Sequence, residues 1–261
     1  IYQNLDPSIS SEFTGYDRLE EDATVQALVF LSDEEGQGSI CEKITEGQKA
    51  AIITDKTPFY ATMGGQQGDQ GEISGENSLF IVDETIHLQG GKIAHLGVME
   101  QGEINLNEKV HLSVDEEARN LTARNHTATH LLQKALKTVL GSHVEQAGAY
   151  YDDKRLRFDF THFAALSKDE LKKVEEMVNQ EIAKGELVKT EEMSLEDAKK
   201  SGAIALFGEK YGDKVRVVSV GDFSVELCGG THVSQSGSIQ GFKILSEQGI
   251  AAGVRRIEAL T

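Results

Sequence analysis

Two short stretches about a hundred residues apart carry the side chains best suited to chemistry: His126-Thr-Ala-Thr-His130 and Cys228-Gly-Gly-Thr-His232. On a helix, residues four apart project from one face, so both rings of the first stretch should point the same way. The Gly229-Gly230 pair lets the backbone fold tightly between the other two candidates. Zinc is a borderline-soft ion that accepts both imidazole nitrogen and thiolate sulfur in a tetrahedral set. We therefore predict one zinc site formed by His126, His130, Cys228 and His232.

The helical pattern around the histidine pair supports this interpretation. One apolar stripe is formed by Ala128, Leu132, Ala135, Leu136 and Val139. At about 100° per residue, the two histidines lie nearly opposite the stripe. The stripe should pack in the core, which leaves the histidines facing something else. Two core histidines with satisfied hydrogen bonds are therefore a weak alternative, whereas two exposed histidines without a ligand stay open.

Two familiar classes of zinc enzyme do not fit this spacing. A zincin protease needs Glu directly after the first histidine as its general base, and Thr127 stands there. The His-x-Glu and Pro-Cys-x-x-Cys signature of zinc deaminases is absent from the sequence as well. Neither proteolysis nor base deamination is indicated.

Composition describes an ordinary globular protein: 261 residues, of which 26% are charged and 39% hydrophobic. No apolar run approaches the roughly 18 residues of a membrane span, and the acidic first thirty or so residues lack the basic start of a signal peptide. We expect a cytoplasmic protein without a membrane partner.

Two cysteines cannot form a disulfide framework, and a zinc site at Cys228 leaves Cys41 as an inert thiol.

The formal net charge of −17 argues against tight, autonomous binding of nucleic acid, because such proteins usually present a basic face to phosphates. Local basic clusters do occur. They comprise Lys154, Arg155 and Arg157, then Lys199 and Lys200, and finally Arg255 and Arg256. Solvated strand edges or helix surfaces explain these clusters equally well.

A break in the pattern near residue 115 predicts two domains, 1–114 and 115–261. Strands are predicted at 23–31, 48–54, 78–89, 92–99 and 109–114, with Gly90-Gly91 as a hairpin turn and an acidic turn at 32–39. They suggest a small antiparallel β-barrel. The stretch 57–71, with its several glycines, is interpreted as a loop that either connects strands or approaches a ligand closely.

The second domain should begin with a helix capped by Asp115 that runs to Leu140 and ends at Gly141, with or without a break before His126. A capping box at Ser167 and Glu170 predicts a helix to Lys184, and a short helix should start at Ser194. Strands are predicted at 143–151, 155–161, 187–193, 215–220, 223–227, 239–246 and 253–260. Helices on one face of an antiparallel sheet make an α+β domain.

Several motifs carry a resemblance to a known family. Asn125–Leu132, Leu156–Phe160, Gly202–Tyr211, Glu226–His232 and Gly253–Glu258 resemble the editing domain of alanyl-tRNA synthetase. Thr57–Tyr60, Gly64–Gln66 and Gly68-Asp69 resemble the domain before it, although Thr62-Met63 departs from the acidic-then-small pair expected there. Free-standing editing proteins share the zinc signature. The synthetase-like Gly15–Leu19 and the missing initiating Met favour a fragment of the synthetase.

The resemblance implies zinc-dependent hydrolysis of the ester that joins serine or glycine to the 3′ end of alanine tRNA. It carries over the four zinc residues and adds Thr129 and Gln146 as pocket residues. A nucleophilic role for Cys228 is a less favoured alternative to its role as a zinc ligand. Weak tRNA contacts are expected from Arg155, Arg157, Arg255 and Arg256. The partners would be tRNA(Ala) and the rest of the synthetase, whose ATP-dependent charging site lies upstream. The alternative is a tRNA-binding or spacer module with a structural zinc.

Overall fold

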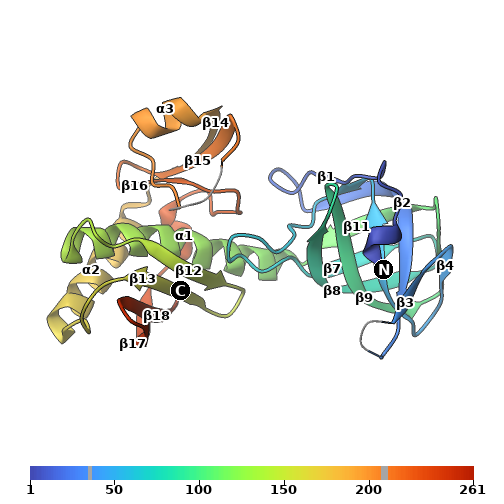
Figure 1. The fold of residues 1–261 in the computed structure, drawn as a ribbon, viewed down its shortest axis with the longest axis horizontal. Coiled ribbons are helices and arrows are strands. Elements are labelled where there is room, and N and C mark those ends of the chain that lie inside the picture. The colour runs from blue at the N-terminus through green and yellow to red at the C-terminus, as the bar shows by residue number, and fades with distance from the viewer. Residues whose placement is uncertain (35–36, 207–210) are drawn as a thin grey trace. The chain divides into compact units, whose positions relative to one another are not determined.

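The computed structural model describes residues 1–34, 37–206 and 211–261 and divides into two compact units (Figure 1). The first unit comprises Ile1–Met63 and Gln67–Arg119, and the second comprises Gly64–Gln66 and Asn120–Thr261. The predicted turn at 32–39 and the motif Gly202–Tyr211 lie partly outside the described residues. Within the described part, no helix is long and apolar enough to cross a membrane.

The first unit is built around a closed antiparallel barrel, as the sequence predicts. Its six strands are β2 (Glu20–Leu31), β5 (Lys49–Thr54), β7 (Gly71–Ser74), β8 (Leu79–Leu88), β9 (Lys92–Gln101) and β11 (Lys109–Val114). They pair in the order β11-β7-β8-β9-β5-β2, and β2 pairs back with β11. Closure leaves these six strands without a free edge for unwanted pairing. Strand β3 (Gly38–Cys41) pairs with the far end of β2.

Shorter elements complete this unit. They are the 3₁₀ turn η1 (Tyr2–Asn4) and the two-residue strands β1 (Glu12–Phe13), β4 (Lys43–Ile44), β6 (Lys56–Thr57) and β10 (Ile104–Asn105). Strand β1 pairs with β6 in parallel, and β4 pairs with β10 antiparallel. The sequence did not predict β7, because its four residues include a single buried apolar side chain, Ile73.

The apolar run of β5 is buried on both faces of the barrel wall. Ala50 and Ile52 pack in one cluster with Phe80, whereas Ala51 and Ile53 pack in another. The second cluster includes Leu5 from the N-terminal segment. A strand covered on both sides reads as a continuous hydrophobic stretch rather than an alternating one, which is why β5 could be placed from the sequence.

The second unit contains most of helix α1 (Glu116–Leu140). The helix is continuous through the histidine pair, so the break before His126 that the sequence allowed does not occur. The Asp115 carboxylate accepts a hydrogen bond from the Ala118 amide at 3.1 Å, as expected for an N-cap. The chain leaves the helix at Gly141, where φ is +127°. The fully buried stripe on α1 consists of Ala128, Leu131, Leu132, Ala135 and Leu136.

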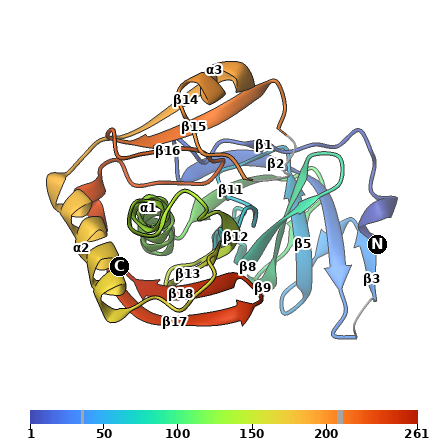
Figure 2. The same cartoon turned by 60° about the vertical axis from the view of Figure 1, so that its left-hand side comes forward.

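Two antiparallel sheets, rather than the single predicted sheet, surround α1 (Figure 2). The larger has the order β12 (Gln146–Tyr151), β13 (Leu156–Thr161), β18 (Val254–Leu260) and β17 (Lys243–Ala251). The smaller contains β14 (Val188–Ser194), β15 (Lys214–Val220) and β16 (Ser224–Leu227). One core cluster joins the α1 stripe to Phe158 and Phe160 of β13 and to Val174 and Val178 of helix α2 (Lys168–Lys184).

The capping box that begins α2 is confirmed: Ser167 accepts from the Glu170 amide while the Glu170 carboxylate accepts from the Ser167 amide. The helix ends at Gly185, and α3 (Leu195–Lys200) is capped by Ser194 as predicted. The strand predicted at 239–246 begins late, because residues Ser236–Ile239 form the 3₁₀ turn η2. Gln240 then adopts a positive φ of 74°, so strand geometry resumes only at Lys243.

A buried ion pair ties together three segments of the first unit. The Arg119 Nε donates to the Asp69 carboxylate at 3.0 Å, and its terminal nitrogens donate to the carbonyls of Gly15 and Pro58 at 2.8 Å each. Asp69 also accepts from the Tyr60 amide at 2.8 Å. Both charged side chains are 7% exposed or less. The Thr57–Asp69 loop is therefore fixed by hydrogen bonds that need both charges.

Replacing Arg119 by Ala should destabilise the first unit by about 3–5 kcal/mol, because it leaves the buried Asp69 carboxylate without a cation. Urea denaturation followed by circular dichroism measures the loss. The matched control is Arg18→Ala, which removes a half-exposed pair with Glu21 and should cost less than about 1 kcal/mol. Equal losses in the two variants would show that the buried pair contributes no more than a surface pair.

Candidate metal centre

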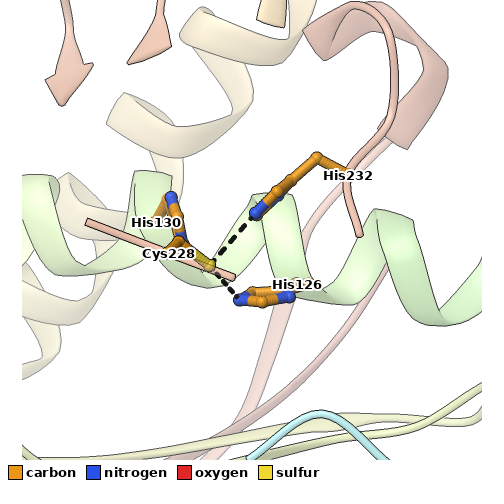
Figure 3. A group of neighbouring side chains, drawn as sticks. All are labelled: His126, His130, Cys228 and His232. Carbon is orange, nitrogen blue, oxygen red and sulfur yellow. Dashed lines mark hydrogen bonds between the residues drawn. The ribbon is translucent and has the colours of Figure 1, made fainter. Parts of the chain in front are cut away.

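The four predicted metal ligands converge in the second unit. One donor atom from each of His126, His130, Cys228 and His232 lies within 4.8 Å of the others. The Cys228 Sγ is 3.2 Å from His126 Nε2 and 3.3 Å from His232 Nε2 (Figure 3). His126 and His130 are 3% and 4% exposed, so the alternative of two exposed histidines is wrong.

Local structure explains the arrangement. The i, i+4 histidines project from one face of α1, and Cys228 directly follows β16, as the sequence indicated. Gly230 is needed for close approach rather than for an unusual backbone angle, because an added Cβ would fall on the His126 ring and on Gln66 Oε1. Arg216 donates to the carbonyls of Cys228 and Gly230, which holds the loop closed. The loop is thus shaped around the ring of His126.

Each imidazole has a partner for one of its nitrogens. His126 Nδ1 lies 2.8 Å from Gln66 Oε1, and His232 Nδ1 lies 3.0 Å from Thr127 Oγ1. An amide oxygen can only accept, so His126 must carry its proton on Nδ1, and its Nε2 lone pair faces Cys228. Such outer hydrogen bonds are the usual means by which a protein orients metal-binding histidines.

Gln66 is itself fixed in orientation. Its Oε1 also accepts from the Thr231 amide at 2.9 Å, and its Nε2 donates to the Thr231 hydroxyl at 2.7 Å. The adjacent Gly64 and Gly65 are hydrogen-bonded through their carbonyls to Tyr151, whose ring stacks on His126 at 4.1 Å between centroids. Residues 64–66 of the glycine-rich segment therefore contact the side chains of the candidate site.

The third imidazole leaves one nitrogen unpaired. His130 Nε2 lies 3.1 Å from Glu226 Oε2. Within the described part of the chain, the buried His130 Nδ1 and Glu226 Oε1 have no hydrogen-bond partner. A buried nitrogen without a partner is costly unless a ligand uses its lone pair. The donor set and this orphaned nitrogen together fit a metal ion.

Burial is the main cause of the shifted pKa values in this cluster. It lowers the pKa of His130 to about 3 and that of His126 and His232 well below the usual range, so all three rings are neutral at pH 7. It also raises the pKa of the Cys228 thiol to about 12 and that of Glu226 to about 8. A bound dication would offset the cost of a buried thiolate, because it supplies the positive charge that the site lacks.

The other predicted site residues are not among the four clustered side chains. The Thr129 hydroxyl donates to the Asn125 carbonyl at 2.8 Å, within the helix. Gln146 begins β12 with a partly exposed side chain. Cys41 lies in β3, and its thiol is 3.7 Å from the Leu28 carbonyl. The structure records no link from Gln146 or Cys41 to the four clustered residues within the described part of the chain.

The four arginines expected to contact tRNA all have carboxylate neighbours. Arg155 pairs with Glu258 at 3.0 Å and Arg255 with Glu247 at 2.7 Å. Arg157 and Arg256 share Asp159, at 3.7 and 2.8 Å. These pairs reduce the positive charge available to phosphates.

The sequence did not indicate which side chains would contact the ring nitrogens of the clustered histidines. Thr127 was considered only as the absence of a catalytic Glu, Glu226 only as part of a motif, and Gln66 only as part of a loop. Helical spacing gave no signal for Thr127, because residues i and i+1 do not share a face and its partner, His232, is distant in the chain. Nothing local connects Gln66 to residues 126 and 231.

Replacing Cys228 by Ala should lower zinc affinity by at least about tenfold, because it removes the only sulfur donor of the cluster. Metal content after dialysis against a weak chelator measures this, and the unaltered chain should hold one zinc. Cys41→Ala is the matched control and should keep its metal. Stoichiometric zinc in the Cys228→Ala protein would exclude that sulfur from the ligand set.

The metal-free protein should lose stability as pH rises through about 8, because the folded pKa of Glu226 is raised above its unfolded value of about 4.5. The folded state then holds the proton more tightly, and this contribution is complete below about 4.5. Glu226→Gln mimics the protonated side chain. Urea denaturation between pH 5.5 and 9 should therefore show the original chain falling relative to this variant, whereas a constant difference would argue against a perturbed Glu226.

Comparisons with known proteins agree with this architecture. Residues 2–118 match the family described as tRNA synthetases class II (A), and residues 215–258 match the Threonyl and Alanyl tRNA synthetase second additional domain. Similar proteins include alanine–tRNA ligase 1 of Lachnoclostridium phytofermentans, 58% identical over the whole chain, and alanine–tRNA ligase of Acetivibrio thermocellus, 47% identical over the same length. The ligase of Francisella tularensis subsp. novicida is 50% identical over 98% of the chain.

In each case the chain spans 29% of the length of the relative. The two matched regions contain the barrel and the Cys228–His232 loop. The identity extends over the segments between them, including α1 and its histidine pair. The chain belongs to the alanyl-tRNA synthetase family.

Proposed function

We propose that this chain hydrolyses the ester joining serine or glycine to the 3′ end of alanine tRNA, with zinc held by His126, His130, Cys228 and His232. The observation that carries the proposal is the cluster of nitrogen and sulfur donors, in which His126 and His130 are buried and Cys228 and His232 are partly buried. Gln66 and Thr127 orient two of its rings. Membership of the alanyl-tRNA synthetase family supplies the substrate class.

The need for such an activity follows from the limits of binding selectivity. A synthesis pocket shaped for alanine cannot sterically exclude glycine, and it rejects a small added hydroxyl only weakly. Errors must therefore be removed at a second site that accepts the wrong esters and spares the right one. Charging with alanine and its use of ATP would belong to other parts of the relatives, whose length this chain covers only in part.

The chain's own residues would position the substrate and exclude other reactions. When bound, zinc would supply a Lewis acid that orients the amino acid end of the substrate. The Cys228 thiol, whose pKa is raised to about 12 by its removal from solvent, is a poor nucleophile, so its proposed role is that of a ligand. Water would then attack the ester carbonyl without a covalent intermediate on the protein.

Binding of tRNA by this chain alone should be weak and strongly salt-dependent. The net charge is −17, and the four candidate arginines already pair with carboxylates. We propose that the remainder of the synthetase supplies most of the affinity for tRNA(Ala).

A second candidate function has an observation of its own. If all four donors bound zinc, they would fill a tetrahedral set, which is typical of structural zinc sites, whereas catalytic sites keep one position open. On this alternative the chain would be a tRNA-binding or spacer module without turnover.

The purified zinc-loaded chain should deacylate seryl-tRNA(Ala) and glycyl-tRNA(Ala) faster than alanyl-tRNA(Ala), because the pocket must spare the correct product. Release of labelled amino acid measures the three rates. Removing zinc should abolish the activity and restoring it should recover it. A fully loaded, folded chain that hydrolyses none of the esters would favour the structural-zinc alternative.

Replacing Thr129 by Val should lower the ratio of seryl to alanyl deacylation while zinc content stays constant. The Thr129 proton is donated to Asn125, so the hydroxyl oxygen can act toward a serine substrate only as an acceptor. Losing that acceptor should cost about 1 kcal/mol, or roughly fivefold in the ratio.

The matched control for Thr129 is Thr138→Val. Thr138 lies on the same helix, and its hydroxyl donates to the Lys134 carbonyl at 2.8 Å in the same way. It is exposed and lies outside the metal cluster. If both variants change the ratio equally, or if neither does, Thr129 plays no part in recognising serine.

A further inference from the structure

A cavity of about 330 Å³ lies beside the metal centre, within the second unit. Its lining includes Asn120, Ala123, Arg124, His232, Ser234 and Ser238. The first three lie on α1, and His232 is one of the four clustered donors. The cavity and the metal centre therefore share a side chain.

Arg124 differs from the arginines that the sequence singled out. It forms no ion pair with any residue that the structure describes, whereas Arg155, Arg157, Arg255 and Arg256 all lie close to carboxylates. Its helix neighbours three and four residues away are Asn120, Leu121, Thr127 and Ala128, none of them acidic. A partly buried guanidinium without a counter-charge is suited to binding an anionic ligand.

Apart from Arg124, the polar side chains that line this cavity are neutral, and Ala123 and Val233 complete the lining. Asn120 offers an amide, and Ser234 and Ser238 offer hydroxyls. The wall is held in place, because the Thr127 hydroxyl contacts His232 Nδ1 at 3.0 Å and accepts from the Val233 amide at 3.2 Å. The Ser234 carbonyl accepts from the Val188 amide at 2.9 Å. The cavity is thus a polar pocket that contains one cationic side chain, Arg124, beside a loop that is fixed by hydrogen bonds.

We propose that this cavity binds the terminal nucleotide of the aminoacylated RNA and that Arg124 contacts the phosphate on its 5′ side. The proposal rests on the function proposed above, because an ester on the terminal ribose must reach the centre that His232 borders. The volume is at the lower end of the roughly 300–1,000 Å³ of ligand pockets, which suits one nucleotide and not a helical stem. One guanidinium can pair with the phosphate of a single nucleotide.

The test uses two small esters that differ only in a phosphate: serine esterified to the ribose of adenosine 5′-monophosphate, and the same ester of adenosine. Arg124→Gln should lower kcat/KM for the phosphate-bearing ester by about tenfold, as expected for one charge-assisted hydrogen bond. It should leave the adenosine ester unchanged. Lys134→Gln removes one positive charge from the same helix ten residues further along and should affect neither ester.

Binding provides a readout that does not depend on turnover. The zinc-loaded chain should bind adenosine 5′-monophosphate more tightly than adenosine in a nuclear magnetic resonance titration, and Arg124→Gln should remove the difference. Zinc content and circular dichroism verify that the variant is folded. A loaded chain that binds the monophosphate preferentially but hydrolyses no ester would contradict the proposed function and support the binding site.

The inference about Arg124 is overturned if the unaltered chain shows no preference for the phosphate, in binding and in hydrolysis. It is equally overturned if Arg124→Gln retains that preference, or if Lys134→Gln loses it to the same extent. The last result would mean that the preference for the phosphate depends on the overall charge of α1 and not on Arg124 in the cavity.

Discussion

Three imidazoles and one thiol lie together in a small volume that is largely shielded from water, and side chains from distant segments hold them there. Burial keeps the rings neutral and raises the thiol's pKa, so the cluster presents lone pairs without positive charge. The orphaned His130 Nδ1 shows that protein partners alone do not satisfy the cluster. A dication that accepts both nitrogen and sulfur would complete it.

The orienting contacts come from segments that are far apart in the chain. Gln66 lies in a short segment preceding most of the barrel strands, yet it contacts both His126 and Thr231. Thr127 joins α1 to the loop after Cys228 through His232 and Val233. Because each loop is held by the other's side chains, a change at Gln66 or Gly230 should disturb the donors without touching them directly.

The sequence predicted those features that depend on local chemistry. The cap at Asp115, the capping box at Ser167 and the stop at Gly185 were placed correctly, because each is a backbone hydrogen-bonding requirement met within a few residues. The convergence of His126 and His130 with Cys228 and His232 was also predicted, since helical spacing places the first two histidines on one face.

Features that depend on distant contacts could not be predicted in this way. The role of Gln66 and the pairing of Arg256 with Asp159 join residues 60 and 97 positions apart. In the second sheet, β14 pairs with β15 over its full length. The hydrophobic pattern of the two strands does not reveal this pairing or its register. Strand β7 is too short to show a period.

X-ray absorption at the zinc K-edge would show whether the four side chains bind the metal, because it reports the atoms bound to zinc whether or not the chain is active. We expect one sulfur at about 2.3 Å and three nitrogens at about 2.0–2.1 Å. Imidazole scattering should be visible for all three. A zinc shell of oxygen and nitrogen without sulfur, or with fewer than two imidazoles, would contradict this expectation.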